Sequence, residues 1–259
     1  MSTNPGEVRF DQRGAIATIR FDRPTARNAM TWAMYEAFDT ALDRVAAAPD
    51  LRVLVLRGAG GNFVAGTDIS QFVEFTSGDD GLAYEARLEG MLTKLESLPV
   101  VTVAAVEGYA AGGGLALAAA CDLRIASPNA EFGVPIARTI GNCLSMGNYA
   151  RLVASLGSAR TKAMLLTAEF MSSDEARSLG FVLRVLEPHA FDRELDMLCT
   201  RLASLAPLTL QVTREAVRRI VSRSVADGDD LVRRVYASRD FREGVAAFVE
   251  KRSPRWEGR

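Results

Sequence analysis

A run of apolar residues that leads into three successive glycines constrains this chain more than any other feature. Residues 100–106 read VVTVAAV and predict a strand that is buried on both faces of a sheet. Residues 107–120 read EGYAAGGGLALAAA and predict glycine-rich backbone that continues into an alanine-rich helix. The N-terminus of such a helix carries backbone N–H groups without partners, and Gly112, Gly113 and Gly114 let a ligand approach them closely. The stretch therefore predicts either a site for negative charge or glycines that serve tight packing of the helix on its strand.

Composition and charge exclude several classes of protein. The 259 residues, 48% of them hydrophobic, suffice for one large domain or for one domain with a smaller appendage. A formal net charge of −1 argues against nucleic acid as a partner. No run reaches the roughly 20 apolar residues that span a bilayer, and the N-terminal residues lack the apolar core of a signal peptide. We therefore expect a cytoplasmic protein without a nucleic-acid or membrane partner.

The cysteines predict neither a disulfide framework nor a metal site. Cys121, Cys143 and Cys199 are odd in number and have no close spacing. A reducing compartment is the simplest interpretation of thiols that are spaced in this way.

Hydrophobic periodicity predicts alternating strands and helices over the first half of the chain. Residues 8–10 and 15–21 predict two strands joined by a tight turn, and Thr31 predicts the N-cap of the helix that follows. A further helix is predicted over residues 84–98, and the polar residues 76–81 before it are predicted to form a mobile loop. The alternation predicts repeated ββα units, and the last part of the chain reads as mostly helical.

Four segments, taken in order, resemble the signatures of one family. They are FDRPTARNAM at residues 21–30, NFVAGTDI at residues 62–69, the stretch around the glycine run at residues 99–122, and FREGVAAFVEKR at residues 241–252. Together they are similar to the enoyl-CoA hydratase/isomerase, or crotonase, superfamily, over about residues 8–251. Each motif is weak alone, but four in the right order are specific.

The resemblance implies an α/β fold, a crotonase/ClpP-like spiral of ββα units with a helical C-terminal region that trimerises. On this basis residues 1–190 are expected to form the core with the coenzyme A-binding and oxyanion-hole loops, and residues 191–259 the oligomerisation region. The expected assembly is a homotrimer, or a hexamer formed by two trimers. The expected ligand is an acyl-CoA thioester, with coenzyme A as part of the substrate and no separate cofactor or metal.

The resemblance also implies the residues of the site. Two backbone N–H groups in this family polarise the thioester carbonyl, and by position they map to Thr67 and Gly113. Preorganised donors of this kind stabilise an enolate or a related oxyanion, typically by a few kcal/mol each. The expected contacts to coenzyme A are Arg27, Ala29, Ala65, Asp68 and Ile69. The expected residues of the acyl pocket are Gly112, Ile136, Arg138 and Cys143. For Arg27 a solvated surface position is an equal alternative, and for Cys143 a nucleophilic role is the alternative to lining the pocket.

The chain departs from the family pattern at both glutamates that a hydratase uses. Ala116 stands two residues after the third glycine, and Ile136 follows the Phe-Gly-x-Pro segment at residues 132–135. Neither side chain can move a proton. The reaction is therefore open to isomerisation, decarboxylation or thioester hydrolysis, or the chain is an acyl-CoA-binding protein without turnover. The candidates for another acid or base are Glu74, Asp68 and Cys143.

Overall fold

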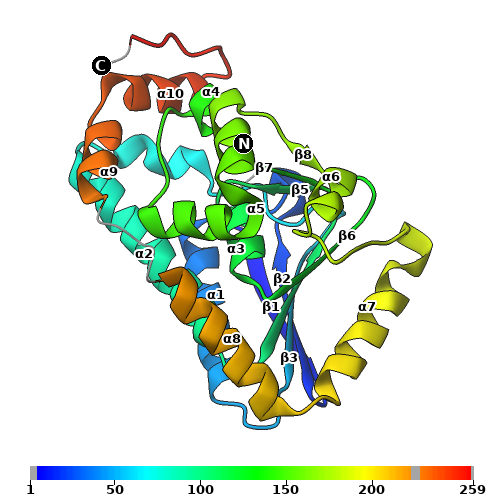
Figure 1. Ribbon diagram of the computed structural model, residues 1–259. Coiled ribbons are helices and arrows are strands. Elements are labelled where there is room, and N and C mark those ends of the chain that lie inside the picture. Colours follow the sequence, from blue (N-terminus) through cyan, green and yellow to red (C-terminus); the bar gives the residue numbers. More distant parts are fainter. Residues whose placement is uncertain (1–4, 223–227, 258–259) are drawn as a thin grey trace.

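The computed structural model describes residues 5–222 and 228–257, which form a mixed α/β fold (Figure 1). A six-stranded sheet has the order β1-β2-β3-β4-β6-β9, and a three-stranded sheet has the order β5-β7-β8. The strands are β1 (Glu7–Arg13), β2 (Ile16–Asp22), β3 (Val53–Gly58), β4 (Val101–Val106), β5 (Tyr109–Ala111), β6 (Leu123–Ala126), β7 (Glu131–Gly133), β8 (Met171–Ser172) and β9 (Arg184–Val185). The α-helices are α1 (Trp32–Ala46), α2 (Gly78–Ser97), α3 (Gly113–Ala120), α4 (Ile136–Thr139), α5 (Met146–Thr167), α6 (Ser173–Ser178), α7 (Pro188–Ala203), α8 (Pro207–Ser222), α9 (Asp229–Tyr236) and α10 (Arg239–Val249). Two 3-10 helices are η1 (Pro24–Ala26) and η2 (Ile69–Glu74).

The stretch predicted as a buried strand lies in the middle of the larger sheet. It forms β4, which is buried at every position and pairs in parallel with β3 on one side and β6 on the other. Strands covered on both faces need apolar side chains on both faces, which explains the unbroken apolar run. The β1–β2 hairpin, which turns at Gly14, adds an antiparallel strand at one edge.

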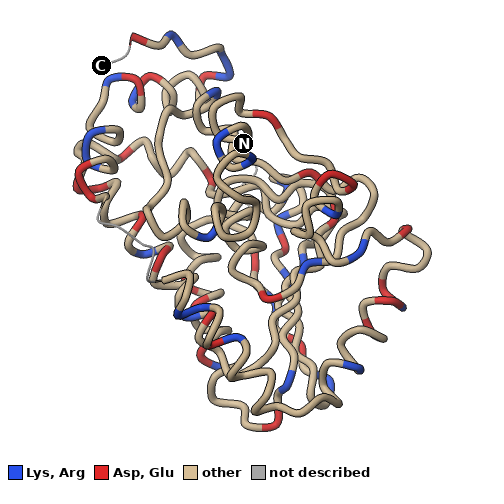
Figure 2. The backbone as a smooth tube through the Cα atoms, in the orientation of Figure 1, with Lys and Arg blue, Asp and Glu red and all other residues tan. Residues whose placement is uncertain are grey.

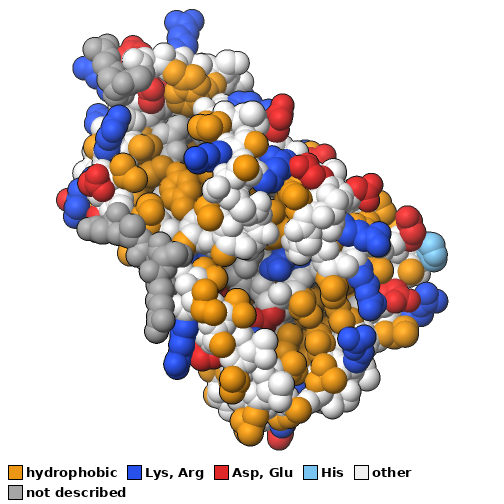
Figure 3. Space-filling view, viewed as in Figure 1, with side chains coloured by type: hydrophobic (Ala, Val, Ile, Leu, Met, Phe, Trp, Pro, Cys, Tyr) orange, Lys and Arg blue, Asp and Glu red, His pale blue; other side chains and the backbone are white. Residues whose placement is uncertain are grey.

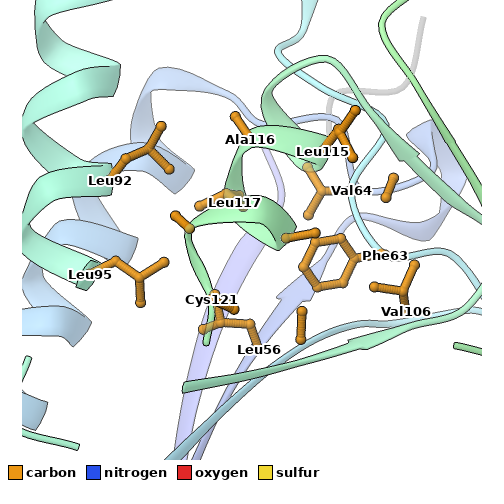
Figure 4. Packing of buried hydrophobic residues seen from close by; sticks show 14 of the residues in the cluster. Leu56, Phe63, Val64, Leu92, Leu95, Val106, Leu115, Ala116, Leu117 and Cys121 are labelled. Carbon is orange, nitrogen blue, oxygen red and sulfur yellow. The ribbon is translucent and has the colours of Figure 1, made fainter. Parts of the chain in front are cut away.

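Helices α2 and α3 pack together over one face of this sheet. In Figure 4, Leu92 and Leu95 of α2 point toward Leu117 of α3 within the buried apolar core. The close approach of α3 depends on Gly114, because a Cβ atom there would collide with the carbonyl oxygen of Val64. Tight packing therefore explains one glycine of the run.

The mobile loop predicted at residues 76–81 is wrong, because residues 78–81 form the first turn of α2 and residue 77 caps it. Ser77 is the N-cap: its hydroxyl accepts from the Asp80 N–H, and the Asp80 carboxylate accepts from the Ser77 N–H at 2.8 Å. This capping box satisfies N–H groups that would otherwise lack partners at the helix start. Gly81, which lies within the predicted loop, lets α9 lie against α2, because a Cβ there would collide with the Tyr236 ring.

The helices after residue 190 pack on the rest of the chain in two places. Phe191 and Leu195 of α7 cover the face of the six-stranded sheet opposite to α2 and α3. Helices α9 and α10 return to the upper left of Figure 1, where they pack against α2 and η2. Phe72, Tyr236 and Phe241 meet there in a separate apolar cluster.

Charged residues of both signs are mixed along the chain (Figure 2). Helix α8 is an example, because Glu215 pairs there with Arg218 and Arg219, each at 2.6 Å. Within residues 5–222 and 228–257, no helix has the length and apolar character that a membrane crossing requires.

Candidate active site

The segment after β2 is tied to the loop after β3 by the buried side chain of Asn28. Its backbone is left-handed, with φ of 59°, which asparagine tolerates better than most residues. Its amide oxygen accepts from the Arg23 N–H at 2.8 Å. Its amide nitrogen donates to the carbonyl oxygens of Ala59, Asn62 and Phe63, at 2.8, 2.7 and 3.2 Å. The Asn28 side chain thus fixes the position of the segment after β2 relative to the loop after β3.

Backbone hydrogen bonds extend this contact to the residues of the predicted coenzyme A site. The Ala65 N–H donates to the Arg27 carbonyl at 3.1 Å, the Met30 N–H to Gly66 at 2.8 Å, and the Asp68 N–H to Met30 at 2.9 Å. The two loops therefore form one surface, although more than thirty residues separate them in the sequence.

Thr67 and Gly113, the two predicted N–H donors, lie side by side at the ends of different segments. A Cβ atom on Gly113 would stand 3.7 Å from the Thr67 hydroxyl oxygen. Each residue follows a glycine with positive φ, 101° for Gly66 and 52° for Gly112, a conformation that side chains with a Cβ rarely adopt. Among the backbone hydrogen bonds of residues 5–222 and 228–257, none uses the N–H of Thr67 or Gly113 as donor. Both N–H groups are thus available to a ligand.

Two tyrosines hold the Thr67 side chain in place. The Thr67 hydroxyl lies 2.7 Å from the Tyr35 hydroxyl on α1 and 2.7 Å from the Tyr84 hydroxyl on α2. Burial raises the pKa of Tyr35 to about 12 and that of Tyr84 well above its ordinary value, so both hydroxyls stay neutral. This arrangement fixes the backbone at Thr67.

The two N–H positions open into a cavity of about 80 Å³. Its walls come from the loop after β3, from η2, α2 and α3, and from the segment between β7 and α5. The lining residues include Ala65, Gly66, Thr67, Ile69, Phe72, Tyr84, Glu85, Leu88, Gly112, Gly113, Ala116, Ile136, Asn142, Leu144 and Asn148.

Glu85 is a buried carboxylate in the wall of this cavity, and it is not among the residues predicted from the sequence. One carboxylate oxygen accepts from the Tyr236 hydroxyl at 2.9 Å, and the other accepts from the Ser145 N–H at 2.8 Å. Burial raises the pKa of Glu85 to about 7, although both hydrogen bonds favour the charged form, and the charge of Glu89 raises it further. A carboxyl group with this pKa can both take up and return a proton near neutral pH.

A signal for Glu85 was present in the sequence. Glu85 precedes Leu88 by three positions and Leu92 by seven, the spacing of one helix face. A glutamate on the apolar face of a helix is uncommon unless it is paired or functional, because a buried charge is costly. The helical spacing therefore marked Glu85 as a paired or functional carboxylate, and it gave no such signal for Glu74.

Of the predicted contacts to coenzyme A, Ala65 and Ile69 line the cavity, whereas Arg27, Ala29 and Asp68 do not. Arg27 is exposed and its guanidinium stacks over the Tyr109 ring, 4.8 Å from the centroid. Ala29, two residues later, is half-buried. Asp68 is engaged by Arg23 in an ion pair of 2.8 Å and accepts from the Ser70 hydroxyl at 2.7 Å. Asp68 therefore has a structural partner and does not line the cavity.

Three other predicted residues do not line the cavity. Arg138 lies on α4 with its side chain exposed, and Glu74 is exposed at the end of η2. The Cys143 sulfur lies 3.9 Å from the Leu231 carbonyl oxygen of α9. Burial raises the pKa of Cys143 to about 12. The thiol form therefore dominates at neutral pH, which argues against a nucleophilic role.

Comparisons with known proteins agree on one family. The sequence profile described as enoyl-CoA hydratase/isomerase matches residues 11–259. A probable enoyl-CoA hydratase of Mycobacterium bovis is 33% identical over 256 residues, 97% of each chain. The human mitochondrial enoyl-CoA hydratase domain-containing protein 2 is 33% identical over 253 residues, 94% of this chain and 86% of its own.

Solved structures share the fold over its whole length. A methylmalonyl-CoA decarboxylase in complex with 2S-carboxypropyl-CoA is 26% identical, with a TM-score of 0.87 and 100% of both chains covered. An enoyl-CoA hydratase/carnithine racemase from Magnetospirillum magneticum is 30% identical, with a TM-score of 0.80 and coverage of 100% of this chain and 97% of its own.

Proposed function

The chain belongs to the enoyl-CoA hydratase/isomerase family of acyl-CoA-processing enzymes, and we propose that its reaction shifts the double bond of an enoyl-CoA thioester by proton transfer. The crotonase fold predicted from the sequence is confirmed by the solved structures that it resembles. A double-bond shift of this kind needs donors that stabilise the thioester oxyanion and one group that moves a proton.

The proposal places the thioester oxygen between the N–H groups of Thr67 and Gly113. Removal of a proton from the carbon next to the thioester moves negative charge onto that oxygen, and two N–H donors would stabilise it. Gly113 is the first residue of α3, so the partial positive charge of the helix N-terminus adds to its effect. Support comes from the adjacency of the two residues and from their free N–H groups.

Glu85 is proposed as the group that carries the proton, and its position in the cavity wall is the observation that carries this proposal. Its carboxylate would take a proton from C2 of a 3-enoyl-CoA, which leaves a dienolate. The same group would then return the proton to C4, which places the double bond between C2 and C3 in conjugation with the thioester. One carboxyl group suffices for this sequence, whereas Ala116 and Ile136 stand where a hydratase has its glutamates.

The test compares two substrates at equal enzyme concentration. We expect 3-hexenoyl-CoA to give the conjugated 2-enoyl thioester, seen as a rise in its ultraviolet absorbance, at a rate at least tenfold above hydration of crotonyl-CoA. Hydration that equals or exceeds isomerisation would overturn the proposal. If neither isomerisation nor hydration exceeds the rate without enzyme, the result would favour a CoA-thioester-binding protein without turnover.

Decarboxylation is a second candidate, because it passes through the same thioester enolate. The likeness to a solved methylmalonyl-CoA decarboxylase favours it. Methylmalonyl-CoA therefore belongs in the same set of substrates, with release of carbon dioxide as the measured product.

We propose that the homotrimer or hexamer expected from the resemblance assembles through the exposed apolar face of α8. One side of α8 is anchored to the core by Arg214, which pairs with Asp122 at 2.6 Å. The other side exposes Leu208, Val212 and Ile220, with 73%, 67% and 71% of their surface accessible. In Figure 3, some of the apolar side chains of the lower part of the molecule lie over α8, and a denser group lies between α8 and α7. Exposed apolar surface of this kind marks a protein interface.

We expect sedimentation to give the mass of a trimer or a hexamer for the wild-type chain. Val212→Asp should shift the distribution to monomers, because each copy would bring a charge into an apolar interface. Leu166→Asp is a matched control on α5, also an exposed apolar residue. A monomeric wild type, or an unchanged mass for Val212→Asp, would contradict an α8 interface.

A further inference from the structure

Two buried amide atoms in the cavity wall have no hydrogen-bond partner. Among the described residues, the buried side-chain atoms without a partner are Arg57 Nε, Asn142 Oδ1 and Asn148 Nδ2. The two asparagines line the cavity that contains Thr67, Gly113 and Glu85, and Asn148 has 2% of its surface exposed. A buried polar group without a partner costs about 1–3 kcal/mol, so its presence calls for an explanation.

The hydrogen-bond network fixes which end of each amide is free. Arg151, which has donors and no acceptor, lies with Nη1 3.4 Å from Asn148 Oδ1, and this leaves Nδ2 as the free end. The Tyr236 hydroxyl donates to the Glu85 carboxylate, so it can only accept from Asn142 Nδ2, at 3.0 Å. Asn142 Oδ1 is then the free end. The cavity thus offers one unused donor and one unused acceptor.

The charges around the cavity argue for a neutral group. Glu85 is the charged residue among the described residues that line it. The nearby Arg151 is engaged by two carboxylates, those of Glu89 at 2.6 Å and Glu96 at 2.7 Å. A carboxylate on the acyl group would therefore meet Glu85 without a free cation to balance it. A hydroxyl group, which donates one hydrogen bond and accepts others, matches the free atoms.

We propose that the acyl group for which this site is built carries a hydroxyl group that donates to Asn142 Oδ1 and accepts from Asn148 Nδ2. The proposal rests on the proposed function, because it takes the acyl chain of a CoA thioester as the occupant of the cavity.

The experiment measures binding without turnover, by calorimetric titration of saturated CoA esters. The ligands are butyryl-CoA and its 2-hydroxy, 3-hydroxy and 4-hydroxy derivatives, with succinyl-CoA as the carboxylate. We expect at least one hydroxybutyryl-CoA to bind about tenfold or more tightly than butyryl-CoA, and succinyl-CoA to bind more weakly than either.

Variants show whether the preference comes from the two amides. Asn148→Leu and Asn142→Leu keep a similar volume and should each reduce the ratio of the affinities for the hydroxybutyryl-CoA and for butyryl-CoA to within about threefold. Asn129→Leu, at an exposed turn, is the matched control and should keep the full preference. Circular dichroism checks that each variant is folded.

Equal affinity of the wild type for butyryl-CoA and every hydroxybutyryl-CoA would overturn the proposal, because water then satisfies the two amides. Tightest binding of succinyl-CoA would overturn it in favour of an acidic acyl group. A preference that survives both leucine variants would also overturn it. The double-bond shift is measured separately with 3-hexenoyl-CoA, so loss of the proposed reaction and loss of the hydroxyl preference are distinguishable.

Discussion

Glu85→Gln is expected to lower the rate of the double-bond shift by about 10²–10⁴, with the affinity for acyl-CoA nearly unchanged. The glutamine keeps the size of the side chain and can still accept from the Tyr236 hydroxyl, but it cannot take up a proton. The measurement is the turnover number for 3-hexenoyl-CoA, together with the dissociation constant of butyryl-CoA. Loss of turnover with retained binding would identify a role in proton transfer.

The pH dependence gives a second readout for Glu85. The proposed reaction begins with the ionised carboxylate, and the pKa of Glu85 is raised to about 7 by burial. The wild-type turnover number should therefore rise with pH and level off above pH 7, and the residual rate of Glu85→Gln should lack this step. Glu74→Gln is the matched control, because Glu74 is an exposed glutamate outside the cavity. An unchanged rate in Glu85→Gln, or an equal loss in Glu74→Gln, would remove Glu85 from the mechanism.

Gly113→Pro is expected to lower the turnover number by about 10²–10³, the usual effect of removing one oxyanion donor. Proline lacks the backbone N–H, and Gly113 is the first residue of α3, a position where proline is well tolerated. The change should therefore remove the donor and leave the helix in place. The measurement is again the turnover of 3-hexenoyl-CoA at saturating substrate.

Gly113→Ala is the control at the same position, because alanine keeps the N–H. Its Cβ would lie 3.2 Å from the Tyr35 hydroxyl, a tight contact that a small shift of that hydroxyl can relieve. We expect the alanine variant to keep at least a tenth of the activity and the proline variant to fall well below it. Equal losses would point to crowding at this position, and the N–H of Gly113 would have no role.

The parts of the site that local sequence patterns encode were predictable. The apolar run predicted β4 at the centre of the sheet, and the glycine run predicted the start of α3. The loop motif placed Thr67 as a candidate, and the structure brings it beside Gly113, although their role as oxyanion donors stays a prediction. Each of these signals lies within about twenty consecutive residues.

The parts that depend on distant contacts were not predictable. Tyr236 and Glu85 are 151 positions apart, and nothing in the local pattern of either segment indicates that they meet. Gly81 fell within a predicted loop. The ring that requires a glycine there, that of Tyr236, comes from the distant helix α9. Chain topology decides such contacts, and one sequence contains little information on which helix faces meet.

The Tyr236–Glu85 hydrogen bond also sets the order in which the site becomes complete during synthesis. The strands of the larger sheet end with β9 at Val185, so the core can form while later residues are still being added. Until Tyr236 leaves the ribosome, Glu85 lacks the hydroxyl group that donates to its carboxylate. A nascent chain can therefore fold the segments that carry Thr67 and Gly113 before the Glu85 carboxylate has gained its partner from α9.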